Sequence, residues 1–333
     1  MKTLAKFNLI ALKRSVAVMM AMLMSAFVLI SCDDEDDDMA TPVQKTITET
    51  AAETPRFIIL VSALKRTGLD AVLNGTDEYT VFAPNNEAFE DLLENLGVAN
   101  LDELSAAVGG LDALANILLY HVLAGEVKAA DVTTGFVSTA GVFNSTDGAS
   151  LSAFIDASAG VRINGEANVI TTDIDASNGV IHELNGVILP KNLVELASLS
   201  PNHNSLVAAV GAADPAVAAR LSSESDITTV FAPTDEAFSD LLDAAQVNDL
   251  GELVQALGED GLTSVLLYHT VNGNVRSTGV PNGGVETLEG TNINTNPTAL
   301  TITDVNGTVA NIEAVDIQGT NGVIHVIDAV IQP

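Results

Sequence analysis

Histidine and cysteine are the residues of this chain that most readily act as nucleophiles, bases or metal ligands, and both are scarce. The sequence holds five histidines and one cysteine, Cys32. His121 and His269 each follow a tyrosine, while His182 and His325 each follow Gly-Val-Ile. A single cysteine forms no intramolecular disulfide. No HExxH zinc motif, GxSxG nucleophile elbow, P-loop or GxGxxG fingerprint is present, so we expect no catalytic residues, no metal site and no cofactor.

The elements that must carry these histidines place them on apolar faces. His121 and His269 each end a predicted amphipathic helix, on the same face as leucines three to seven residues earlier. His182 and His325 lie within predicted strands, between apolar neighbours. Because a buried imidazole needs hydrogen-bond partners, we interpret all four as core histidines, with a ligand-binding role as the alternative. We expect His203, in a Pro-Asn-His-Asn turn, to be solvated.

Three sequence blocks occur twice in the same order. TVFAPNNEAF at 80–89 matches TVFAPTDEAF at 229–238, ILLYH at 117–121 matches VLLYH at 265–269, and NGVIHELNGVILP at 178–190 matches NGVIHVIDAVIQP at 321–333. The offsets of 149, 148 and 143 residues are too long for a solenoid repeat. They indicate one duplicated domain, and we expect the two copies at 44–190 and 191–333, with almost no linker.

Each block predicts a particular element. The first is a strand that runs into an amphipathic helix, with Asn85 or Thr234 as the N-cap. The second closes another helix. The third is a hairpin whose returning strand, 322–331 in the second copy, is apolar on both faces and should be central and buried. The structural positions shared by the blocks are Thr80, Phe82, Pro84, Phe89 and His182 in the first copy and Thr229, Phe231, Pro233, Phe238 and His325 in the second.

Together the three blocks resemble the fasciclin domain, also called FAS1 or beta-Ig-H3, over about residues 44–333. The first copy departs slightly, with Asn85-Asn86 for Thr-Asp and Glu183-Leu184-Asn185 for Val-Ile-Asp. The resemblance implies an α+β fold with two tandem FAS1 domains, each a β-sandwich wedge with packed α-helices.

The resemblance also implies a non-catalytic role in cell adhesion. Tyr120-His121 and Tyr268-His269 match the family's Tyr-His motif, which in animal members is associated with integrin-linked adhesion. Their apolar spacing favours the core over contact with a partner. The implied partners are extracellular matrix, a glycan or a cell-surface protein. The alternative is a carrier of a small apolar ligand in the envelope, because the alanine-rich stretch at 205–213 could leave a groove.

Charge narrows the classes of partner. Four of the 13 basic residues and none of the 44 acidic residues precede Cys32, so the chain from Cys32 onward carries nine basic and 44 acidic residues. Such a chain repels polyphosphate and anionic lipid, so we expect no nucleic-acid partner and no electrostatic docking on membranes.

The N-terminus predicts export. Residues 1–14 are basic, and the apolar run at 15–30 has the 16 residues of a signal helix, short of the about 20 that span a membrane. The run ends in Leu-Ile-Ser-Cys, which resembles the bacterial lipobox. This implies a lipoprotein signal peptide at 1–31 and lipidation at Cys32, so that the chain meets the membrane through its lipid anchor only.

An acidic tether follows at 32–43. Its charged residues are Asp33, Asp34, Glu35, Asp36, Asp37 and Asp38. Such a cluster cannot pack and stays solvated. A cysteine followed by acids resembles the lipoprotein export signal of Bacteroidetes, which implies an outer-membrane lipoprotein exposed on the cell surface. A periplasm-facing lipoprotein is the alternative.

Overall fold

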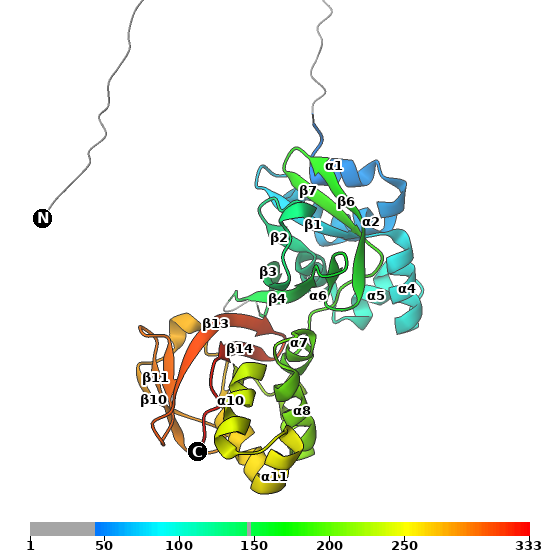
Figure 1. Ribbon diagram of the computed structural model, residues 1–333. Coiled ribbons are helices and arrows are strands. Elements are labelled where there is room, and N and C mark those ends of the chain that lie inside the picture. The colour runs from blue at the N-terminus through cyan, green and yellow to red at the C-terminus, as the bar shows by residue number, and fades with distance from the viewer. Residues whose placement is uncertain (1–43, 145–147) are drawn as a thin grey trace, which may run out of the picture. The chain divides into compact units, whose positions relative to one another are not determined.

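The computed structural model describes residues 44–144 and 148–333, which contain both sequence repeats (Figure 1). The predicted signal peptide, Cys32 and the acidic tether lie outside the described residues. Within the described ranges, no helix combines the length and the apolar character needed to cross a bilayer.

The first repeat is a mixed α+β domain. Its helices are α1 (Ile47–Ala52), α2 (Ile58–Thr67), α3 (Leu69–Leu73), α4 (Asn86–Leu96), α5 (Leu101–Ala107) and α6 (Leu111–Tyr120), with short 3-10 turns at Pro55–Phe57 and Ala129–Asp131. Its strands are β1 (Tyr79–Pro84), β2 (Val122–Ala124), β3 (Gly135–Val142), β4 (Ser150–Asp156), β5 (Arg162–Ile163), β6 (Ala167–Ala176) and β7 (Gly179–Leu184). They follow the order β2-β1-β7-β6-β5-β4-β3 in one sheet.

The second repeat has the same plan. Its helices are α7 (Leu193–Leu199), α8 (Asn204–Ala212), α9 (Pro215–Ser222), α10 (Asp235–Ala245) and α11 (Leu250–Tyr268), with a 3-10 turn at Ser277–Gly279. Its strands are β8 (Thr228–Pro233), β9 (Thr270–Asn272), β10 (Gly283–Glu286), β11 (Asn292–Asn296), β12 (Thr301–Thr303), β13 (Val309–Gly319) and β14 (Gly322–Ile327). Their order is β10-β11-β12-β13-β14-β8-β9. The predicted α+β class and duplication are confirmed.

The returning strand of each hairpin is central, as its two apolar faces predict. β7 lies between β1 and β6, and β14 lies between β8 and β13. Both pair in parallel with the opening strand of their own domain, and every residue of both is buried. In the second domain the returning strand β14 ends at Ile327, so it is shorter than the predicted range of 322–331.

Local signals set the helix ends. The side chain of Asn85 accepts a hydrogen bond from the Ala88 N–H, and that of Thr234 accepts one from the Ala237 N–H, so both predicted N-caps are confirmed. Helix α4 ends at Gly97, which adopts a φ of 67°. Helix α11 is broken at Gly258, where a φ of 73° interrupts the helical backbone. The first domain has separate helices α5 and α6 at the corresponding place.

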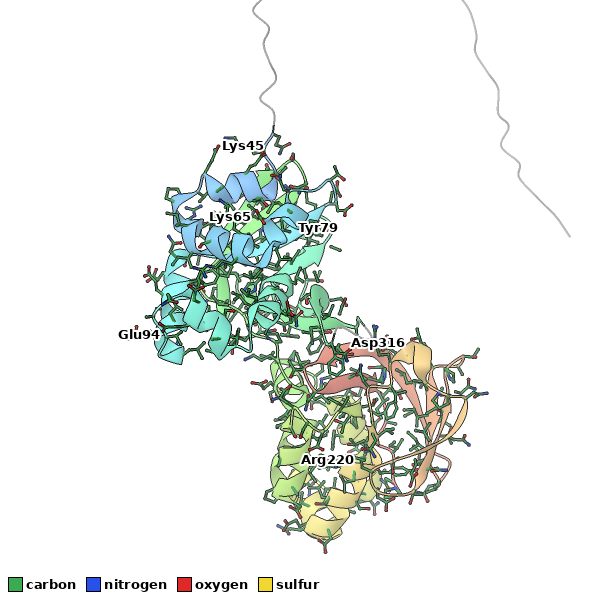
Figure 2. All side chains as sticks on the ribbon, turned by 180° about the vertical axis from the view of Figure 1, so that it is seen from behind. Lys45, Lys65, Tyr79, Glu94, Arg220 and Asp316 are labelled. Atoms are coloured by element: carbon green, nitrogen blue, oxygen red, sulfur yellow. The ribbon has the colours of Figure 1, made fainter. Side chains whose placement is uncertain are left out.

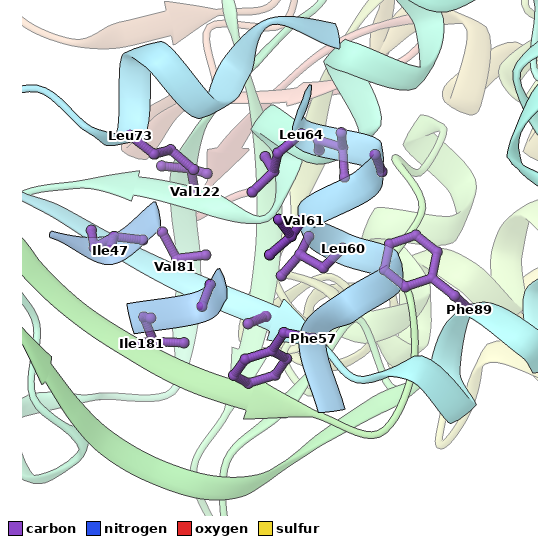
Figure 3. Packing of buried hydrophobic residues seen from close by; sticks show 14 of the residues in the cluster. Ile47, Phe57, Leu60, Val61, Leu64, Leu73, Val81, Phe89, Val122 and Ile181 are labelled. Atoms are coloured by element: carbon purple, nitrogen blue, oxygen red, sulfur yellow. The ribbon is translucent and has the colours of Figure 1, made fainter. Parts of the chain in front are cut away.

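Each domain has two hydrophobic clusters. In the first domain one cluster joins the helices to the sheet, with Phe57, Phe89 and Leu104 packed against Val81 and Ile181, part of which Figure 3 shows. The other lies between the two halves of the curved sheet and combines residues of β1 and β7 with residues of β4 and β5. The second domain repeats both clusters. The sheet therefore wraps around one core while the helices cover the other.

Candidate functional site

The tyrosines of the two Tyr-His pairs lie in the core. Tyr120 is 1% exposed, its hydroxyl donates to the Ser152 carbonyl oxygen at 2.7 Å, and it accepts from the Asn164 amide at 2.9 Å. Burial raises the pKa of Tyr120. Tyr268 is fully buried and donates to the Asn292 carbonyl oxygen at 3.1 Å. Each tyrosine thus joins the end of a helix to a distant strand.

The histidines that follow these tyrosines are also bonded on both sides. His121 donates from Nδ1 to the Ile117 carbonyl oxygen at 2.7 Å, and its Nε2 accepts from the Ile188 N–H at 3.0 Å. His269 makes the same two contacts, with the Val265 carbonyl oxygen at 2.8 Å and the Ile331 N–H at 3.2 Å. Both rings are therefore neutral tautomers fixed by the main chain.

Burial controls the protonation of this pair. It lowers the pKa of His121 and of His269 to about 4, against the smaller opposing effect of their main-chain acceptors. An imidazole of this kind is uncharged at neutral pH and has no free nitrogen. It is poorly suited to act as a general base or as a metal ligand.

The strand histidines fasten an irregularity in the sheet. His182 Nδ1 accepts from the Asp173 N–H at 3.2 Å, and His182 Nε2 donates to the Val127 carbonyl oxygen at 2.9 Å. His325 does the same with the Asp316 N–H and the Val275 carbonyl oxygen. Asp173 and Asp316 have positive φ values of 56° and 61°, where strands β6 and β13 slip in register. Each histidine therefore supports a strained bulge.

The other motif positions build the same core. Phe82 packs on His182 and Phe231 on His325, with ring centroids 5.6 Å apart in both domains. Pro84 and Pro233 end β1 and β8, while Phe89 and Phe238 anchor helices α4 and α10. The Thr80 hydroxyl donates to the Gly125 carbonyl oxygen and accepts from the Val127 N–H; Thr229 pairs likewise with Gly273 and Val275.

Two buried asparagines are structural residues that the sequence did not single out as ties. Asn178 accepts from the Ile47 N–H and donates to the Leu73 and Gly75 carbonyl oxygens. Asn321 repeats this pattern with Leu193, Leu221 and Ser223. From the sequence, the Asn-Gly pair of each domain predicts only a turn. What points to a tie is that it occurs, unchanged, in both copies of the third block.

The predicted solvation of His203 is wrong. The side chain is 5% exposed, and its Nδ1 lies 2.8 Å from the Ser200 hydroxyl. Its Nε2 is buried and has no hydrogen-bond partner among the described residues. The turn that contains His203 is polar in sequence but packs against the sheet, which local composition does not reveal.

The surface carries the charge (Figure 2). Lys45, Lys65 and Glu94 are exposed, and six of the nine basic residues in the described ranges form ion pairs with acids. Among the described residues, no three His, Cys, Asp or Glu side chains converge in a group able to hold a metal ion. The side chains left for partner contact are therefore mostly acidic or neutral.

Comparison with known proteins shows the family. The fasciclin domain model matches residues 55–190 and 201–333. The chain is 40% identical to protein sll1483 of Synechocystis over 155 residues, 45% of this chain and 77% of that protein. It is 36% identical to the pig transforming growth factor-beta-induced protein ig-h3 over 46% of this chain, but only 20% of that protein.

Longer matches span both repeats. Human periostin is 28% identical over 77% of this chain and 27% of its own length. The solved FAS1 domain pair of the insect cell adhesion molecule fasciclin I covers 83% of this chain and 97% of its own, with a TM-score of 0.50 at 18% identity, which bears on the fold alone. From the duplicated motifs, the fold and these matches, the chain belongs to the fasciclin family as a tandem pair of FAS1 domains.

Proposed function

We propose that this protein is a non-catalytic adhesion module, held at the cell surface by a lipid on Cys32, that contacts matrix, a glycan or a surface protein of another cell. The observation that carries the proposal is the fasciclin match over both repeats. The periplasm-facing orientation remains the alternative for its location.

The core geometry directs the search for the contact surface. The hydroxyl of Tyr120 and both nitrogens of His121 are bonded inside the first domain. A partner would therefore bind exposed side chains. Ile58 and Ile170 are 63% and 52% exposed on the first domain. We propose that a partner contacts this domain at such exposed apolar residues.

A binding screen tests adhesion. Residues 44–333 are passed over immobilised matrix proteins and glycans at low and physiological salt. A basic matrix partner would bind less as salt rises, since surface charges are screened within about 8–10 Å, whereas a neutral glycan would not. Blank arrays, together with normal attachment of a deletion strain, would refute the adhesion proposal.

Two substitutions test the anchor and the orientation. Cys32→Ala should move the protein from the membrane fraction to the soluble fraction, and retention in the membrane would contradict lipidation. Replacing the six acids at 33–38 by alanine should reduce protease accessibility on intact cells. An unchanged accessibility would count against the export signal, while the Cys32→Ala result stays independent of it.

A second candidate function is a carrier of a small apolar ligand. It is favoured by one observation, an apolar pocket in the second domain between α10 and α11.

A further inference from the structure

The second domain contains a pocket of about 360 Å³ between helices α8, α10 and α11 and its last residues. Its walls include Phe238, Leu241 and Ala245 of α10 and Leu257, Leu262 and Val265 of α11. An apolar cavity of about 150 Å³ already binds a benzene-sized molecule, and ligand sites begin near 300 Å³. The pocket is therefore large enough for a small apolar ligand.

The first repeat shows what opens the pocket. The motif offsets of 148 and 149 residues give the corresponding positions, and four wall residues of the second domain are smaller: Ala245 replaces Leu96, Gly261 replaces Ala113, Ser264 replaces Asn116 and Val265 replaces Ile117. Leu96 is itself 45% exposed in the first repeat. One is larger, because Leu257 stands where the first repeat has Val108, but Leu257 remains 42% exposed. The wall of this pocket therefore carries smaller side chains than the matching surface of the first repeat, within an otherwise shared fold.

A second, smaller space lies next to the pocket. A second void of about 30 Å³ lies between α7, α8 and the sheet, and it shares Leu206, Leu266 and His269 with the pocket. Its lining includes Val210, at the position of Leu64 in the first repeat; here the offset is 146, because Ser205 and Ile59 make matched contacts with Asp235 and Asn86. His269 separates the two spaces as a neutral ring, because both of its nitrogens are bonded to the main chain. The inner wall thus offers an occupant apolar surface and no charge.

Charge at the pocket selects the occupant. Helices α10 and α11 carry seven acidic residues and no basic residue. The Ser264 hydroxyl, which lines the pocket, donates to the Glu289 carboxylate at 3.4 Å. None of the three basic residues of this domain, Lys191, Arg220 and Arg276, lines the pocket, and neither does any of the seven acids of the two helices, so the negative charge lies around the pocket and not in its walls. A carboxylate or phosphate head would meet negative charge without a counter-ion.

We propose that this pocket binds one amphiphile that is uncharged or cationic, with its apolar part inside and its head beside Ser264 and Gln332. The proposal rests on the second candidate function and names its ligand class. A free fatty acid or other anionic amphiphile is disfavoured, because no lining residue supplies a counter-ion and the Glu289 carboxylate lies beside Ser264.

Three ligands with the same eight-carbon chain and different heads test this: octanol, octylammonium and octanoate. Each is titrated into residues 44–333 at pH 7 by calorimetry, below its aggregation concentration. We expect saturable one-site binding of octanol and octylammonium, and binding of octanoate that is weaker by about tenfold or more. Absence of saturable binding for the first two, or equal binding of octanoate, would overturn the proposal.

Variants assign the site. Ala245→Leu combined with Val265→Ile restores the side chains of the first repeat and should abolish octylammonium binding while the melting temperature is kept or raised. The matched control is Ala212→Leu on the exposed face of α8, which should bind like the original protein. Undiminished binding by the filled variant would place the ligand elsewhere and refute the assignment. The filled variant should still adhere, so failure of the pocket proposal and failure of the adhesion proposal are separate outcomes.

Discussion

Replacement of His203 by phenylalanine should stabilise the second domain. The first repeat has Phe57 at the corresponding position, and Phe57 is fully buried. The correspondence is set by matched contacts two residues later: the Ile59 N–H donates to Asn86, and the Ser205 N–H donates to Asp235. The second domain thus holds an imidazole where its sister domain holds a benzene ring.

The magnitude follows from the unpartnered nitrogen. A buried polar group without a hydrogen bond costs about 1–3 kcal/mol, and His203→Phe removes it. The added ring volume faces a small space lined by Ala197, Ala232 and Ile324, which limits the cost of overpacking. The change also removes the hydrogen bond between His203 Nδ1 and the Ser200 hydroxyl, which contributes about 1 kcal/mol. We therefore expect a net gain of about 1 kcal/mol in the free energy of unfolding, or about 3 °C in the melting temperature of a domain of this size.

The gain should depend on pH. Burial lowers the pKa of His203 below the ordinary histidine value, so the unfolded chain binds a proton that the folded domain does not. The original domain therefore loses stability as pH falls below about 6.5. The phenylalanine variant has no imidazole at this position and does not show this loss. The advantage of the variant should widen between pH 7 and pH 5.

Urea unfolding of residues 44–333, followed by far-ultraviolet circular dichroism at both pH values, measures this difference. The reciprocal change Phe57→His serves as the control and should destabilise the first domain by about 3 kcal/mol or more. If His203→Phe destabilises the second domain, or if its effect is the same at pH 7 and pH 5, the reasoning about the unpartnered nitrogen is refuted.

Three further changes probe the shared core. Gly322→Ala should abolish folding of the second domain, because a Cβ there would lie 1.8 Å from a carbonyl oxygen of β8. Gly211→Ala in helix α8, where a Cβ meets nothing within 4 Å, should instead stabilise the domain by up to about 1 kcal/mol. Equal melting temperatures of the two variants would contradict both expectations. Asn321→Ala should cost about 3 kcal/mol or more in urea unfolding, since it leaves buried main-chain groups unpaired; a loss below about 1 kcal/mol would show that water replaces the side chain. The stability of both domains should fall as pH drops from about 6.5 towards 4, because His121 and His269 are neutral in the folded domains and protonated in the unfolded chain. A calorimetric melting temperature that stays constant over this range would contradict the lowered pKa of these two histidines.

Local features of the fold were predictable from the sequence. The N-caps at Asn85 and Thr234 and the burial of β14 follow from residue types within one turn or one strand. The buried setting of His121 and His269 follows from helical spacing, because the periodicity of an apolar face is a local signal. The repeat added strength to each prediction, since every element occurs twice.

Features that depend on distant contacts were not predictable. The tie between Asn178 and Ile47 joins residues 131 positions apart, and the burial of His203 depends on the sheet that packs over its turn. The pocket was anticipated only in part. The alanine-rich helix contributes Leu206 to its wall, but the alanine that opens it, Ala245, belongs to α10, which the sequence presented as an ordinary amphipathic helix.

The parallel pairing of the opening and closing strands has a consequence for how each domain forms. Thr80 pairs with Val180, and Thr229 pairs with Val323, so the central ladder joins positions about a hundred residues apart. Contacts of such long sequence separation make folding slow, because the intervening chain must be ordered first. A domain emerging from a ribosome cannot complete its sheet until its last strand appears. The central ladder of each domain therefore forms late, after nearly the whole domain has been synthesised.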